Sequence, residues 1–132
     1  MSNLLQEVEL GVARALSGIP GLQVLERDTD EIKGTKIAVI KAQIDREFVP
    51  GSRIWEVSVE VALRINRTTN DAGDSAETLQ SVLAALCNAN RATVQGTHLE
   101  LYSWFVGSTT SQWAEDCSIY LIKVRTHAVQ VS

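Results

Sequence analysis

The chain contains few of the residues that build metal centres, disulfide frameworks or nucleophilic sites. Its 132 residues include only two cysteines, two histidines and two prolines. Cys87 and Cys117 fall on the apolar sides of an expected helix and an expected strand, which predicts buried free thiols and suits a reducing cytosol. His98 and His127 have no metal-ligating neighbours at a useful spacing. We therefore expect no bound metal, no cofactor and no reaction that depends on these four side chains.

The sequence also lacks long apolar runs, glycine-rich loops and an excess of positive charge. No run is long enough to span a bilayer, so no membrane association is expected. The eight glycines are isolated and form no phosphate loop. The formal net charge is −4, whereas a general nucleic-acid binder is normally basic. Because no catalytic set is recognisable either, the sequence predicts a protein that is not an enzyme and binds no specific nucleic-acid sequence.

The strongest pattern that is present is an alternation of apolar and polar residues over positions 53–66. Every odd position from Trp55 to Ile65 is apolar, and the even positions include Glu56 and Glu60. Side chains alternate between the two faces of a strand, so this pattern predicts one long strand with one apolar face. We expect Val59 and Val61 to be buried against a helix that carries Leu83 and Leu86.

Two amphipathic helices and several further strands surround that strand. The helices are expected at 4–17 and at 76–88, the second with Asp74 as its N-cap. The other strands are expected at 22–26, 35–44, 97–106 and 113–131, with a loop at 107–111, a turn at Pro50-Gly51 and a bulge near Leu121-Ile122. The sequence therefore predicts one domain, 1–132, of the α+β class. Its mostly antiparallel sheet of about five strands packs against two helices in the order αβββαββ.

Three tryptophans have different expected roles. Trp55 belongs to the apolar stripe and is expected in the core. Trp104 lies on the same strand face as Glu100, so either it forms a contact surface or the second helix covers it. Trp113 begins the last expected strand, where it anchors either the preceding loop or a neighbouring subunit.

Charge is distributed unevenly along the chain. The strand-rich segment 35–67 holds six basic and four acidic residues, whereas 68–116 holds one basic and six acidic residues. Asp28, Asp30 and Glu31 lack the calcium-loop pattern and are expected in a solvated loop. Segments of opposite sign can pair between copies of one chain.

The full-length order of elements, the helix that ends in Gly18-Ile19-Pro20-Gly21-Leu22, and the run 55–61 followed by 78–83 resemble the tail terminator (tail completion) proteins of long-tailed bacteriophages. That resemblance implies a structural virion protein without catalytic residues. It implies a homohexameric ring on the head-proximal end of the tail tube, which ends tube growth and makes the head-tail connection. The implied partners are further copies of the chain, the tail tube protein and the head-tail connector proteins, with DNA passing through the lumen. The implied location is the tail or neck of the virion, assembled in the host cytoplasm.

A ring of this kind needs contacts between subunits, and loops commonly carry them. The residues expected at the subunit interface are Asp28, Asp30, Glu31, Arg46, Glu47, Arg53 and Trp113. Two other readings of the sequence stay open. One is another phage neck or minor tail subunit, and the other is a small cytosolic ligand-binding or enzyme domain with an α/β architecture.

Overall fold

The computed structural model describes residues 4–19, 21–26, 36–66, 72–88, 99–113 and 117–130. Within these ranges lie two helices and five strands, which confirms the predicted α+β class and element order. In chain order they are α1 (Leu4–Leu16), β1 (Leu22–Glu26), β2 (Lys36–Glu47), β3 (Trp55–Asn66), α2 (Ala72–Asn88), β4 (Leu99–Trp113) and β5 (Cys117–Gln130).

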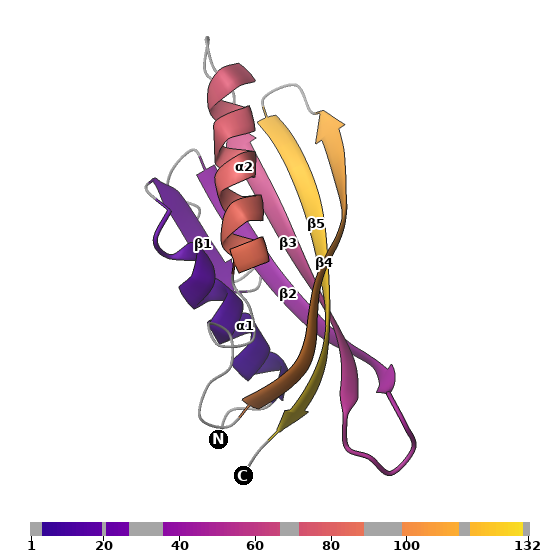
Figure 1. Ribbon diagram of the computed structural model, residues 1–132. Coiled ribbons are helices and arrows are strands. Elements are labelled where there is room, and N and C mark those ends of the chain that lie inside the picture. Colours follow the sequence, from indigo (N-terminus) through magenta and orange to yellow (C-terminus); the bar gives the residue numbers. More distant parts are fainter. Residues whose placement is uncertain are drawn as a thin grey trace.

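The described strands form one sheet in the order β1-β2-β3-β5-β4. Only the β1–β2 pair is parallel, and the other three pairs are antiparallel. The long alternating strand, β3, therefore lies at the centre and is hydrogen-bonded on both sides. Both helices lie over the same face of this strongly twisted sheet (Figure 1). We call that face the helix face and the opposite one the outer face.

The core lies between the helix face and the two helices, as the alternation predicts. Val59 and Val61 are 1% and 0% exposed, and Leu86 of α2 is 0% exposed. Leu83 is partly buried and packs against the same cluster. The side of α1 that meets the sheet repeats at intervals of four residues and contributes Leu4, Val8, Val12 and Leu16. Burial of side chains of this size stabilises a fold by roughly 1.5–3 kcal/mol each, so this layer holds the molecule together.

Helix α2 ends at Asn88 as expected, but it differs from expectation in its start and in the exposure of Cys87. It begins at Ala72, so Asp74 lies in its first turn and the prediction that Asp74 is the N-cap is wrong. Cys87, near the end of the helix, is exposed, so the prediction that its thiol is buried is also wrong. Cys87 directly follows the buried Leu86, and successive residues of a helix point about 100° apart.

Strand β4 is longer than predicted because a glycine that reads as a loop signal lies within it. The expected loop at 107–111 is wrong, since β4 runs without a break to Trp113. Its register against β5 shifts between Val106 and Thr109. A Cβ atom built on Gly107 would lie 3.3 Å from the carbonyl oxygen of Lys123, so the glycine permits a close approach of the two strands. Trp113 therefore ends β4, and the prediction that it begins the last strand is wrong.

The predicted bulge near Leu121-Ile122 is also wrong for strand β5. That strand pairs with β3 without a register shift from Cys117 to Ala128. Its even positions face the core throughout, including the buried Ser118 and Thr126. The apolar residues at odd positions lie on the outer face, which explains the apparent change of pattern. The irregularity belongs to the neighbouring strand β4.

A second register shift in β4, between Leu101 and Ser103, decides which aromatic residue is buried. Beyond this shift, Trp104 turns toward the core and Phe105 is 63% exposed. Trp104 Nε1–H donates a hydrogen bond of 2.9 Å to the carbonyl oxygen of Leu86 in α2. The alternative in which the second helix covers Trp104 is therefore confirmed.

Candidate functional site

The end of the β2–β3 pair projects away from the helices (Figure 1). We call residues 44–56 the projecting hairpin. Strand β2 extends past the predicted end at residue 44 to Glu47, because a bulge between Ile44 and Arg46 accommodates Asp45 as an extra residue. Bulges bend a strand and increase its twist, which suits a hairpin that leaves the plane of its sheet. Neither of the two described helices lies over the tip of this element (Figure 1).

The loop that closes the hairpin is held in one shape by the carboxylate of Glu47. That carboxylate accepts hydrogen bonds from the backbone N–H groups of Gly51 and Arg53, each at 2.9 Å. Both residues have positive φ angles, 85° and 60°, which glycine adopts freely and arginine only with support. The Phe48 N–H donates to the carbonyl oxygen of Ile54 at 2.7 Å and closes the loop at its base. The loop is therefore a braced turn of defined conformation.

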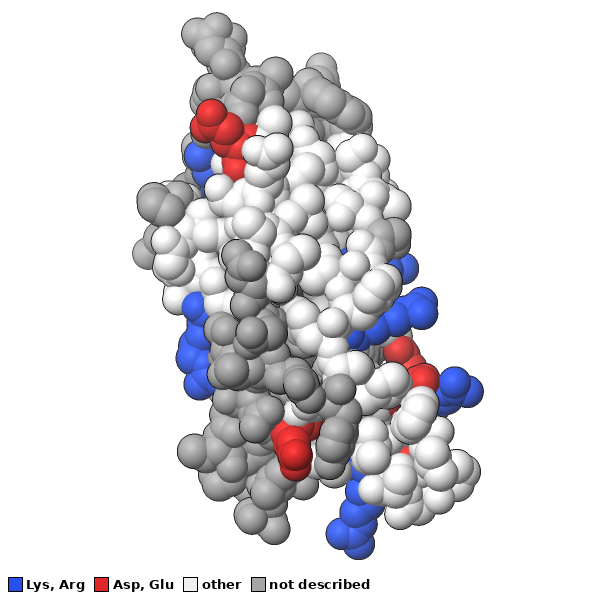
Figure 2. Space-filling model, in the orientation of Figure 1, with Lys and Arg blue, Asp and Glu red and all other residues white. Residues whose placement is uncertain are grey.

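This braced turn carries exposed apolar side chains. Phe48 is 49% exposed and Val49 is 51% exposed, and Ile44 on the stem is 41% exposed. An exposed apolar residue alone needs no explanation, but Phe48 and Val49 are adjacent at the tip of a projecting element, where they are suited to protein contact. Figure 2 shows uncharged residues across the centre of that view and charged side chains toward its edges, several of them at the right and lower right around the projecting hairpin and others on the left.

A polar cluster on the outer face fixes the stem of the hairpin to β5 and β4. Arg46 Nε lies 2.7 Å from Glu56 Oε2, and His127 Nε2 lies 3.5 Å from Glu56 Oε1. The hydrogen bond from Arg46 lowers the pKa of Glu56, and the same bond raises the pKa of Arg46. The ring of His127 also contacts the ring of Phe48, with 4.5 Å between centroids. Three side chains from three strands, Arg46, Glu56 and His127, thus connect Phe48 of the exposed tip to the sheet.

Ser103 completes a Ser–His–Glu sequence of contacts that superficially resembles a hydrolase triad. Its Oγ lies 2.8 Å from His127 Nδ1 and also accepts the backbone N–H of His127 at 3.0 Å. Glu56 is already engaged by Arg46, and its contact with the imidazole is long at 3.5 Å. A nucleophilic serine needs a base that an acid orients by a strong hydrogen bond, and this long contact does not supply one. The geometry fits a structural network that positions the imidazole against Phe48.

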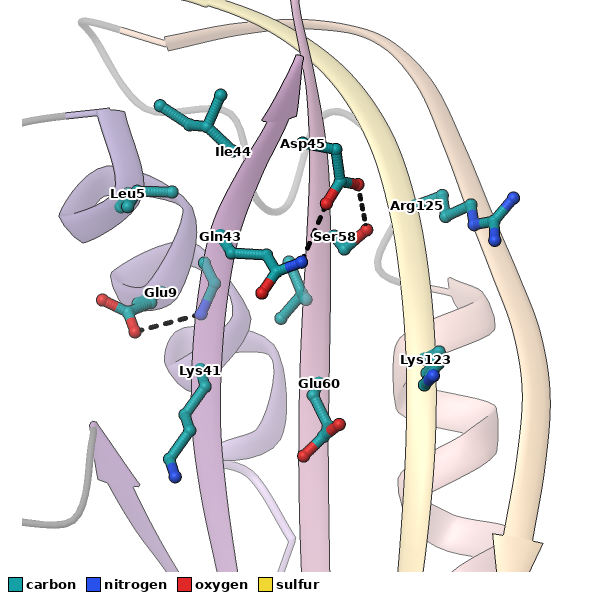
Figure 3. A pocket seen from close by; sticks show the side chains of 12 residues that line it. Leu5, Glu9, Lys41, Gln43, Ile44, Asp45, Ser58, Glu60, Lys123 and Arg125 are labelled. Atoms are coloured by element: carbon teal, nitrogen blue, oxygen red, sulfur yellow. Dashed lines mark hydrogen bonds between the residues drawn. The ribbon is translucent and has the colours of Figure 1, made fainter.

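Beside the cluster, the outer face is hollowed where β2 continues beyond β1. The open hollow measures about 1180 Å³ and is shown in Figure 3. Asp45 accepts hydrogen bonds from Ser58 and, at 2.9 Å, from Gln43, and these bonds lower its pKa. At the rim, Glu9 of α1 is 2% exposed and accepts the backbone N–H of Ala42 at 3.2 Å. The buried carboxylate thus takes the place of a strand partner for β2.

The positive and negative side chains that line this hollow are equal in number. The lining includes three cations and three carboxylates: Lys41, Lys123, Arg125, Glu9, Asp45 and Glu60. A site that selects a small anion or cation concentrates one sign of charge. The hollow therefore offers a mixed polar surface, which is more typical of a protein contact than of a small-molecule pocket.

The interface residues predicted from the sequence are distributed over two described regions and one that is not described. Arg46, Glu47 and Arg53 come together on the projecting hairpin. Trp113 lies at the end of β4, with only its backbone described, and Asp28, Asp30 and Glu31 lie outside the described residues. Sequence reasoning missed Phe48, Glu56 and His127 as a group. The apolar pair Phe48-Val49 beside a turn is the one local signal that could have located the tip.

Neither a metal-binding cluster nor a membrane-spanning helix occurs among the described residues. Within them, no group of three or more His, Cys, Asp or Glu side chains is placed to hold a metal ion. Neither of the two described helices is long and apolar enough to cross a membrane.

No protein-family model and no curated protein matches the sequence. Among solved structures, the chain is similar to a chain in the virion of a native gene transfer agent particle. The TM-score is 0.68 and the sequence identity 10%, and the match covers 96% of this chain and 98% of the other. At this identity the likeness shows the fold alone.

Proposed function

We propose that this chain is a structural virion protein that forms a hexameric ring at the head-proximal end of a phage tail tube. In that position it ends tube growth and joins the tail to the head connector, with DNA passing through the lumen. Its partners are further copies of itself, the tail tube protein and the head-tail connector proteins. The role includes no catalytic step, no cofactor and no membrane.

The observation that carries this proposal is the full-length likeness to a chain of a gene transfer agent virion, which leaves almost no residue of either chain unmatched. The sequence resemblance to tail terminator proteins supports the finer assignment. A shared fold does not by itself fix a function, so the proposal rests on the agreement between this likeness and the sequence resemblance.

The projecting hairpin supplies the kind of element that such a ring needs. A head-to-tail interface requires a feature on one side of the subunit that fits a different surface of the next copy. Phe48 and Val49 provide apolar contact area on a turn whose shape Glu47 already fixes. Less conformational entropy is lost when such a preformed loop binds. Exposed ion pairs contribute only about 0–1 kcal/mol each, so ring stability comes from many contacts around the circle.

The role is tested by deleting the gene for this chain and examining the particles by electron microscopy. We expect tails of abnormal length, or tails that are not joined to heads. Tails of normal length with a defect confined to the head side would favour the alternative of a neck or minor tail subunit. Normal, infectious particles would refute a structural role and leave the small ligand-binding domain as the better reading.

A second measurement tests location without relying on a phenotype. Particles purified by density gradient are digested and analysed by quantitative mass spectrometry against the tail tube protein. A terminal ring predicts a few copies per particle, whereas a repeating tube component predicts a copy number that rises with tail length. Complementation with the wild-type gene is the control, since it must restore both tail length and copy number.

A further inference from the structure

The two edges of the sheet are protected to very different degrees. Strand β1, at one edge, has only five residues, and α1 packs against it. Strand β4, at the other edge, has fifteen residues. Four consecutive β4 residues, Thr109, Thr110, Ser111 and Gln112, are exposed. A strand at an edge presents unpaired backbone N–H and C=O groups to any other strand that approaches it.

Strand β4 carries almost none of the features that usually block such pairing. It contains no lysine, arginine or proline, and Glu100 is its only charged residue. Register shifts interrupt it at 101–103 and 106–109, but its pairing with β5 is regular from Thr109 to Trp113. Residues 109–113 are thus a straight, uncharged strand with one edge hydrogen-bonded to β5 and the other edge open among the described residues.

A second open edge lies on the opposite side of the same sheet. The partner strand β1 ends opposite Ile40, so β2 continues from Lys41 to Glu47 with no described strand on its outer side. Glu9 covers this edge at Ala42. The stretch 43–47 belongs to the stem of the projecting hairpin, which extends clear of the helices (Figure 1).

We propose that β4 residues 109–113 of one copy pair with β2 residues 43–47 of the next copy, so that the sheet continues from subunit to subunit. This inference rests on the proposed ring and names its contact. Pairing one edge with the other leaves one open edge of each kind at the two ends of a dimer, so addition repeats until the ring closes. Pairing β4 with β4 about a two-fold axis would instead end at two copies.

The topology also fixes the direction of the new pair. Strand β2 is antiparallel to β3, β3 to β5, and β5 to β4, so β4 and β2 run in opposite directions within one subunit. A sheet that continues around a ring keeps its strand directions from copy to copy. The new pair is therefore antiparallel, and its two outer faces are continuous. Side chains that face outward on β4 lie beside side chains that face outward on β2.

Disulfide trapping tests this arrangement in assembled particles, in a background in which the exposed Cys87 is replaced by serine. Thr110, Gln112 and Gln43 lie on the outer face, whereas Ile44 lies on the helix face. Gln43→Cys combined with Thr110→Cys or Gln112→Cys is expected to cross-link most of the chain into covalent species larger than a dimer. The face-mismatched controls, Ile44→Cys with the same β4 partners, are expected to stay at the single-cysteine background, because cross-strand disulfides need side chains on one face.

The outcomes separate this inference from the proposed function. Dimers from Thr110→Cys or Gln112→Cys alone would show β4–β4 pairing and overturn it. Particles that contain the chain but give no cross-linked species beyond background would overturn it while leaving the ring proposal intact. Particles that lack the chain would overturn both proposals.

Added charge gives an independent test. The double change Thr110→Lys and Gln112→Lys places two ammonium groups on the open edge and is expected to abolish incorporation into particles with unchanged Tm. Ser81→Lys and Ala84→Lys, on the exposed side of α2, add the same charge away from the edge and are expected to leave incorporation unchanged. Equal incorporation of the two double variants would overturn the edge contact.

Discussion

Strands β2 and β3 run from the body of the sheet, under the helices, into the projecting hairpin. Different forces stabilise these two parts. Under the helices, Val59, Val61 and Leu63 are at most 1% exposed. Beyond the helices, Phe48 and Val49 are about half exposed, and the backbone there is held by the Glu47 carboxylate. The body is thus stabilised by burial of apolar area, and the hairpin by hydrogen bonds and ion pairs that face water.

This difference indicates which surface is available to bind a partner protein. Removing side chains from the body costs stability directly, so its residues are constrained by the fold. The apolar side chains at the hairpin tip contribute little to the fold, and the polar groups beneath them fix their positions. A loop that has a defined conformation and exposed apolar side chains is suited to bury those side chains against another protein.

The largest expected effect is on the body. Val61→Asp places an unpaired carboxylate between the sheet and α2 and should lower the free energy of unfolding by about 3 kcal/mol or more. Arg64→Asp introduces the same residue on the exposed outer face of the same strand and should change it by less than about 1 kcal/mol. Urea denaturation of both variants measures the difference. Equal stability of the two would contradict the assignment of the two faces of β3.

Next in size is the contrast between two adjacent aromatic residues. Trp104→Phe removes the hydrogen bond to the Leu86 carbonyl and part of the packing against α2, and should cost about 1–2 kcal/mol. Phe105→Ser, one residue away on the exposed side, should be nearly neutral or slightly stabilising. Thermal unfolding followed by circular dichroism separates them. If Phe105→Ser were the more damaging change, the register shift between Leu101 and Ser103 would be misplaced.

That pair also shows what sequence patterns can and cannot predict. The alternation of β3 and the helical spacing of Val8 and Val12 determine faces, because a regular period needs only local geometry. A bulge breaks the period at one residue, and nothing in the composition of β4 marks the point where Trp104 and Phe105 exchange faces. The loop expected at 107–111 is wrong for the same reason, because the sequence around Gly107 does not mark the register shift.

The candidate site also has one part that the sequence predicts and one part that it does not. The Pro50-Gly51 turn predicted the position of the hairpin, on which Arg46, Glu47 and Arg53 lie. Their place at a subunit interface stays a prediction. The polar cluster could not be predicted, because Glu56 and His127 are 71 residues apart in sequence and meet only through the β3–β5 pairing. Local patterns give the faces of strands, whereas the register between distant strands depends on the whole sheet.

Loss of the Glu47 carboxylate, which holds the braced turn, should affect the hairpin and leave the body of the sheet intact. Glu47→Ala removes the acceptor of two backbone N–H groups and should cost about 1 kcal/mol, as the loss of a capping side chain does. Amide exchange at Gly51 and Arg53 should accelerate, while exchange in α2 and β3 should change little. Glu47→Gln keeps one acceptor oxygen and should give an intermediate result. Uniform acceleration throughout the chain would show that the hairpin is not a separate unit of stability.

Acid should also loosen the hairpin before the body. The hydrogen bond from Arg46 lowers the pKa of Glu56 below its ordinary value of 4.5. A lowered carboxyl pKa stabilises the fold at pH values above the unfolded value, and this contribution is lost as pH falls through the folded pKa. NMR signals of Phe48 should therefore shift below pH 4.5, while the methyl signals of Val59 stay constant. Glu56→Gln should remove most of this shift, and a midpoint above 4.5 would contradict the sign.

The smallest effect on stability, and the most specific effect on assembly, is expected at Arg53. Its side chain is exposed, whereas Arg46 is already paired with Glu56 within the chain. Arg53→Glu should change the free energy of unfolding by less than about 0.5 kcal/mol, since it removes no buried contact. It should nevertheless weaken ring formation, and the difference from wild type should shrink at high salt because exposed charges are screened. Arg53→Lys keeps the charge and should assemble normally. Light scattering at low and high salt compares the three proteins. Unchanged assembly of Arg53→Glu at low salt would remove Arg53 from the subunit interface and leave the apolar tip and the strand edges as its basis.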